Sequence, residues 1–232
     1  MFRLAILASF LIFLPTLASA EFVGTVKLKP DDCQKAEYCE LIEDFGYIDK
    51  RGLGWQADKA DRTDGASIPK WAQKFAGDPW TPEYLNASVL HDHCSKSVRP
   101  VRGWFETQRM FYEALVDSGV SQKRAALLYS GVLIGSGKWI VKMKGKKCPI
   151  GKACINNVGE MTIETEAESY GQPAYVESFE RMKARIEASG ELSEDDIVKL
   201  AIQERPNSEY LKHPDGVIKI DLDDWPWPTQ DR

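Results

Sequence analysis

Residues 81–135 constrain the fold most, because they contain three successive stretches with helical start and stop signals. The TPE sequence at 81–83 combines an N-cap residue, a proline at the first helical position and an early acid. It predicts a helix that ends before Pro100. A second helix should end at Gly119, a natural C-terminal stop, and a third should cover 121–134. The sequence therefore predicts a compact three-helix core.

The residues before this core favour strands. Residues 22–29, 40–48 and 53–60 are rich in β-branched and aromatic side chains, and the DKRG sequence at 49–52 predicts a hairpin turn. We therefore expect an α+β fold, in which a small N-terminal β-hairpin or sheet packs on the three-helix core and a charged helical appendage follows at the C-terminus.

The composition changes after Cys154. Residues 173–189 and 193–204 form charged amphipathic patterns typical of surface helices, and 221–232 is an acidic, proline-broken tail. We assign 21–154 to the main domain and 155–232 to an accessory helical segment with an acidic tail.

Residues 1–20 resemble a secretory signal peptide. Arg3 precedes an apolar run, and the small residues ASA follow it, so cleavage is expected after Ala20. A membrane-spanning helix is the competing interpretation, but the apolar run is short and Pro15 interrupts it. The expected location is periplasmic or secreted.

The charge balance argues against a dedicated nucleic-acid binder. The whole chain carries a net charge of −5, and removal of Arg3 with the signal peptide changes this to 29 − 35 = −6. Lysines crowd the stretch 138–152 beside Trp139. This stretch predicts either a solvated basic loop or a peripheral contact with an anionic membrane or envelope.

Five cysteines occur in the chain. Cys33/Cys39 and Cys148/Cys154 share the spacing C-x5-C, and an exported protein can form disulfides, so each pair could close a small loop. Cys94 is then the odd cysteine. A zinc site is disfavoured because no C-x2-C pair is present.

The LHDHC sequence of the first predicted helix holds the candidate chemistry. His91 and His93 are two residues apart, so on a helix they point in nearly opposite directions and cannot share one ion. Asp92 lies about 100° around the helix from His91. A neutral histidine can take a proton while a neighbouring carboxylate binds a hard cation such as Ca²⁺.

Two further candidate residues belong to other segments. Gln108 lies on the inward stripe of the second predicted helix, where a buried amide needs a partner, and a histidine on a facing helix would supply one. The loop DGAS places Asp64 and Gly65 in a tight turn that could direct oxygens to a cation, and Ser67 is expected to cap a helix that starts near Pro69.

Three sequences carry a family resemblance. TDGASIPKW at 63–71, VLHDHC at 89–94 and MFYEAL at 110–115 resemble, in order and spacing, a domain of unknown function found in bacterial and phage proteins. The resemblance covers about residues 39–137.

The same residues distantly resemble secreted phospholipase A₂. The resemblance implies that His91 activates a water, that Asp92 binds Ca²⁺, and that Asp64 and Gly65 form the calcium loop, with a lipid or other acyl ester as substrate. The acid that orients histidine in that family is replaced here by Gln108. The alternatives are a non-catalytic module that binds an envelope or protein partner, and a purely structural His91-Asp92 pair. The oligomeric state is left open.

Overall fold

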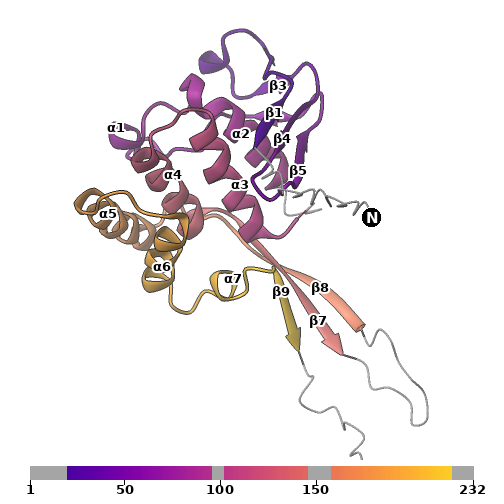
Figure 1. Ribbon diagram of the computed structural model, residues 1–232, viewed down its shortest axis with the longest axis vertical. Coiled ribbons are helices and arrows are strands. Elements are labelled where there is room, and N and C mark those ends of the chain that lie inside the picture. The colour runs from indigo at the N-terminus through magenta and orange to yellow at the C-terminus, as the bar shows by residue number, and fades with distance from the viewer. Residues whose placement is uncertain (1–19, 96–101, 146–157, 221–232) are drawn as a thin grey trace, which may run out of the picture.

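The computed structural model describes residues 20–95, 102–145 and 158–220, and it confirms the α+β class. The N-terminal strands pack against one side of a bundle formed by α2, α3 and α4 (Figure 1). Helices α5 and α6 pack against α4, and the C-terminal strands extend away from this body (Figure 1).

The N-terminal region forms two small antiparallel sheets, ordered β1-β4-β5 and β2-β3-β6. The strands are β1 Glu21–Val23, β2 Leu28–Lys29, β3 Cys39–Leu41, β4 Phe45–Ile48, β5 Gly54–Ala57 and β6 Arg62–Thr63. The predicted hairpin joins β4 to β5, and the Asp49 carboxylate accepts hydrogen bonds from the backbone N–H of Arg51 and of Leu53, both at 2.9 Å. The predicted Cys33–Cys39 disulfide is also present.

The predicted helix boundaries are confirmed closely. The helices are α1 Gln73–Ala76, α2 Pro82–Cys94, α3 Trp104–Asp117, α4 Gln122–Gly135, α5 Pro173–Ala188, α6 Glu194–Glu204 and α7 Glu209–Lys212. Thr81 and Ser121 are the N-cap residues of α2 and α4. After α3, Gly119 adopts a φ of +89°, a conformation that glycine reaches without a steric penalty.

The C-terminal helices share the hydrophobic core of the α2–α4 bundle. Met182 of α5 and Ile197 of α6 are fully buried in the same cluster as the bundle helices. An ion pair between Arg109 of α3 and Glu194 of α6 also links the two parts. The segment predicted as an accessory appendage therefore contributes to the packing of the main domain.

A third sheet, ordered β8-β7-β9, was not predicted. Its strands are β7 Lys138–Gly145, β8 Val158–Glu166 and β9 Val217–Ile220, and β9 runs parallel to β7. The prediction of a loop was wrong for β7, where Lys138 is buried and its Nζ lies 2.6 Å from the Glu166 carboxylate. The proposed Cys148–Cys154 pair lies outside the described residues.

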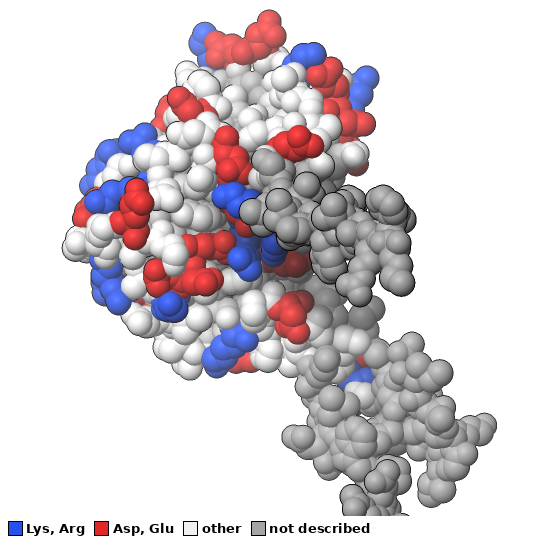
Figure 2. Space-filling model, in the orientation of Figure 1, with Lys and Arg blue, Asp and Glu red and all other residues white. Residues whose placement is uncertain are grey.

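The surface carries both signs of charge. Figure 2 shows acidic and basic side chains interspersed on the face that it draws. Within the described ranges, no helix is both long and apolar enough to cross a bilayer.

A cavity-creating substitution tests whether α5 belongs to the common core. Met182→Ala should lower the free energy of unfolding by about 2–5 kcal/mol, because a fully buried side chain is truncated. Denaturant unfolding, followed by tryptophan fluorescence and by circular dichroism, should still show one transition. Met161→Ala is the control, since Met161 is 65% exposed on β8. A separate early transition in Met182→Ala would contradict the common core.

Candidate functional site

The centre of the site is a buried hydrogen bond between α2 and α3. His91 Nε2 lies 2.8 Å from Gln108 Oε1, and both side chains are buried. An amide oxygen can only accept a hydrogen bond, so with the amide in this orientation Nε2 carries the proton. Nδ1 is then the nitrogen with the lone pair. The prediction that Gln108 faces a histidine across the helix interface is confirmed.

The environment keeps His91 neutral. Burial lowers the pKa of the imidazole to about 4, and the hydrogen bond that its Nε2–H donates to Gln108 opposes this effect. The ring also packs against Phe111, with the ring centroids 4.7 Å apart. A neutral imidazole whose pKa lies below neutral pH is a weak base that is always available to accept a proton.

The Gln108 amide is only partly satisfied. Among the residues that the structure describes, its Nε2 has no hydrogen-bond partner, although the side chain is fully buried. A buried donor left unpaired costs about 1–3 kcal/mol. Packing alone does not account for an amide at this position, since an apolar residue would avoid that cost.

The loop before α1 is tied to Asp92 through Thr63. The hydroxyl of Thr63 donates to Asp92 Oδ2 at 2.5 Å and accepts from the backbone N–H of Gly65 at 3.1 Å. Thr63 is itself buried at the end of β6. The first residue of the TDGASIP sequence thus brings the loop to the carboxylate next to His91.

The loop conformation depends on Gly65. Its φ is +84°, and a Cβ at this position would lie 2.8 Å from the carbonyl oxygen of Pro79. The same carbonyl accepts a hydrogen bond from Ala66 N at 3.0 Å. The expectation that Ser67 caps a helix is wrong, because α1 begins later, at Gln73, and the Ser67 hydroxyl donates to the Asp64 carboxylate at 3.4 Å.

A small, partly open cavity of about 40 Å³ adjoins His91 and Asp92. Most of its wall is apolar, from α2, α3, α4 and α5. The wall includes Phe111, Leu128, Val132, Tyr175 and Phe179. The cavity has room for roughly two or three waters.

A larger depression of about 490 Å³ lies on the other side of Tyr170. His91 and Asp92 line it as well, and Glu166 and Glu168 add negative charge. The pKa of Tyr170 is raised well above its usual value by burial, by Tyr175 and by the carboxylates of Glu168, Asp92 and Asp64. The carboxylates of Asp64 and Asp92 therefore both act electrostatically on Tyr170, and the negative field near this residue favours a cation.

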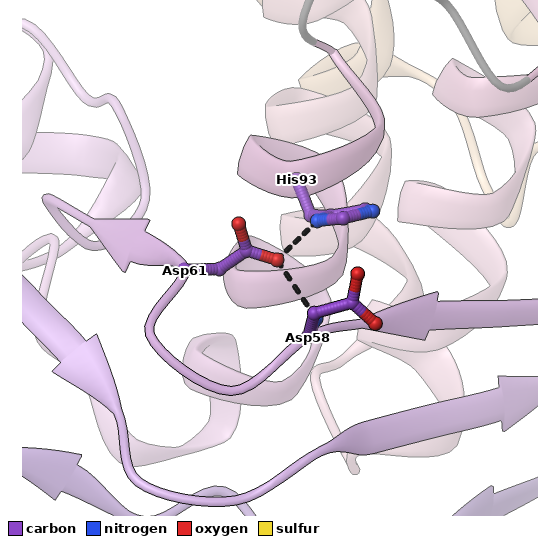
Figure 3. Close-up of side chains that lie close together, drawn as sticks. All are labelled: Asp58, Asp61 and His93. Carbon is purple, nitrogen blue, oxygen red and sulfur yellow. Dashed lines mark hydrogen bonds and ion pairs between the residues drawn. The ribbon is translucent and has the colours of Figure 1, made fainter.

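A second histidine pairs with a carboxylate on another face of α2. Figure 3 shows the Asp61 carboxylate between His93 Nδ1 and the backbone N–H of Asp58, which donates to it at 2.7 Å. Ligand atoms of Asp58, Asp61 and His93 all lie within 4.8 Å of one another, so this cluster could hold a divalent ion. The hydrogen bonds already tie the 58–61 turn to α2. This pairing was not predicted from the sequence, because Asp61 lies in a turn 32 residues before His93.

The structure brings together most of the predicted site. His91 and Gln108 are in direct contact, and Asp92 is connected to Gly65 through Thr63. The Asp64 side chain is exposed, and its carboxylate and that of Asp92 both raise the pKa of Tyr170. Tyr170 is the residue that the sequence analysis missed. The calcium assignment to Asp92, Asp64 and Gly65 stays a prediction.

Comparison with known proteins shows the family to which the chain belongs. The family described as "Protein of unknown function (DUF1353)" matches residues 39–132. The uncharacterised protein y4iH of Sinorhizobium fredii is 38% identical over 173 residues, which cover 72% of this chain and 71% of that protein. The chain belongs to this family. The match spans β3 to α4 and so includes the TDGASIP loop, His91 and Gln108.

A second relative is more distant. The uncharacterised protein y4jT of the same organism is 31% identical over 169 residues, which cover 67% of this chain and about half (49%) of that protein. No solved structure matches the chain. The DUF1353 match ends before β7, so Tyr170 and α5, which close the site, come from outside the matched residues.

The low pKa of His91 predicts a specific pH dependence of stability. In the unfolded chain the imidazole titrates near 6.5, so between pH 6.5 and about 4 only the unfolded state binds the proton. The neutral imidazole makes its full contribution to the free energy of unfolding above pH 6.5, and this contribution decreases by about 3 kcal/mol as the pH falls to 4. Urea unfolding of the wild type and of His91→Asn, compared at pH 7 and pH 4.5, should show an extra loss of about 2–3 kcal/mol in the wild type. Equal losses in the two proteins would contradict the buried neutral imidazole.

Proposed function

We propose that this DUF1353 protein is an exported, calcium-assisted acyl-ester hydrolase that resembles phospholipase A₂. The observation that carries the proposal is the buried His91, which Gln108 orients and which adjoins both an apolar cavity and the carboxylate of Asp92. A positioned base beside an oxygen ligand for a cation is the arrangement that water-mediated ester hydrolysis requires.

His91 would act through Nδ1. With Nε2–H donated to Gln108, the lone pair of Nδ1 can accept a proton from a water in the adjoining cavity as that water attacks the ester carbonyl. The bond from the carbonyl carbon to the alkoxide then breaks, and the imidazolium returns the proton to the alkoxide, which leaves as the alcohol. The imidazolium formed next to Gln108 has an amide rather than a carboxylate as its partner. Because an amide stabilises imidazolium poorly, we expect slow turnover.

The cation side of the site fits calcium by its donor chemistry. Asp92 and Asp64 offer carboxylate oxygens, and Gly65 lies in a loop that Thr63 connects to Asp92. Hard oxygen donors and a locally negative field are what Ca²⁺ prefers. When bound, the ion supplies polarisation of the ester carbonyl and stabilisation of the oxyanion.

The alternative is a non-catalytic module that binds an envelope or protein partner. Gln108 in place of an acid favours it, because the stabilising charge for imidazolium is missing. The small volume of the apolar cavity, about 40 Å³, favours it as well.

Activity with matched variants separates the two. The wild type should release acid from p-nitrophenyl acetate or short-chain phospholipids only with Ca²⁺, and His91→Asn should lower kcat/KM at least a hundredfold, since the base is lost. Gln108→Glu keeps the side-chain length and adds a carboxylate, so it should raise kcat about tenfold or more. No hydrolysis by either the wild type or Gln108→Glu would favour the binding module.

Calcium binding can be measured without turnover. Isothermal titration calorimetry should show Ca²⁺ binding to the wild type, and Asp92→Asn should weaken it at least tenfold because one carboxylate ligand is removed. Asp58→Asn is the matched control on the second cluster and should leave this binding unchanged. If Asp58→Asn abolished binding and Asp92→Asn did not, the ion would belong to the Asp58, Asp61 and His93 cluster instead.

A further inference from the structure

Tyr170 lies on the boundary between the two hollows of the site. It lines the small apolar cavity and the outer depression, together with Ser67, His91 and Asp92. The small cavity measures about 40 Å³ and the outer depression about 490 Å³. The ring therefore separates a narrow apolar space from a wide polar one, and His91 contacts both.

The ring is held by the last turn of α4. The backbone N–H of Ser169 donates to the carbonyl of Gly135 at 2.8 Å, and the ring of Tyr170 packs edge-on against Tyr175, with the centroids 5.3 Å apart. A Cβ at Gly135 would collide with both tyrosine rings and would lie 2.7 Å from Cδ1 of Tyr170. The Tyr170 ring can pack against α4 at this position because Gly135 has no side chain.

Exposed residues flank Tyr170 in the chain. Ala167 and Glu168 are exposed, Gly171 is exposed too, and a Cβ there would meet no atom within 4 Å. The apolar wall of the small cavity includes Phe111, Leu128 and Val132.

The cavity size then determines which acyl groups can bind on the apolar side of His91. Pockets that hold drug-sized ligands measure roughly 300–1,000 Å³, far more than the small apolar cavity here. A long acyl chain cannot occupy that space while the ring is in place, whereas a short acyl group needs little more than the volume of the waters it displaces.

We propose that Tyr170 is the specificity-determining residue of this site: its ring separates the apolar cavity from the outer depression and so restricts the substrate to esters of short acyl groups. That these esters are substrates rests on the proposed function. The position of the ring rests only on the packing of Tyr170 against Gly135 and Tyr175.

The test compares Tyr170→Ala, which joins the two hollows, with Tyr170→Phe, which keeps the ring and removes only the hydroxyl. The first readout is the ratio of kcat/KM for p-nitrophenyl decanoate to that for p-nitrophenyl acetate. The second needs no turnover: decanoate is titrated into each protein, with Kd taken from the methyl NMR signals of Leu128 and Val132.

Tyr170→Ala should raise the decanoate-to-acetate ratio at least tenfold and bind decanoate at least tenfold more tightly, and Tyr170→Phe should match the wild type in both. If Tyr170→Ala does not fold, Tyr170→Leu carries the same expectation, since it also removes the ring. Stronger decanoate binding by Tyr170→Ala without hydrolysis in any variant would retain the role of the Tyr170 ring and overturn the hydrolase. Equal decanoate binding by the wild type, Tyr170→Phe and the folded ring-less variant would overturn the role of Tyr170, whatever the activity.

Discussion

The hydrogen bond between His91 and Gln108 is the interaction on which the site depends. It crosses the α2–α3 interface inside the core, so both helices must be in register for the contact at 2.8 Å to form. Burial keeps the imidazole neutral, and the amide oxygen selects the tautomer with Nε2 protonated. The unpaired Nε2 of Gln108 is a cost within the same contact. The arrangement therefore lowers the stability of the fold but holds the His91 imidazole in one protonation state and one tautomer.

The surrounding elements place that imidazole between different environments. The TDGASIP loop, held against Pro79 by Gly65, carries Thr63 to the carboxylate of Asp92. Helices α4 and α5 supply the apolar side, and Tyr170 separates it from the acidic depression. Residues from three distant parts of the chain thus meet at α2.

Much of this arrangement follows from local sequence. The proline at position 82, the stop at Gly119 and the inward position of Gln108 depend on helical geometry alone, which a single sequence displays directly. The strands β7 and β8 escaped prediction because their many charged side chains, such as Lys138 and Glu166, pair across strands rather than alternating with apolar residues. Such pairing is a long-range property that no local pattern records.

The same limit explains the missed parts of the site. Tyr170 reaches His91 only after the chain has passed through β7 and β8, and the Asp61–His93 contact joins residues from a turn and a helix. The local pattern around each of these residues is ordinary. Their roles become visible only when the fold brings the segments together.

The state of the His91 imidazole tests this account most directly. Long-range ¹H–¹⁵N NMR correlation spectra of the histidine rings, recorded between pH 5 and pH 8, report which ring nitrogen carries the proton. The account predicts that His91 stays neutral and protonated on Nε2 across this range, and that Gln108→Leu, which removes the accepting oxygen, releases this preference. A His91 that becomes doubly protonated near pH 6.5, or that carries its proton on Nδ1, would contradict the account.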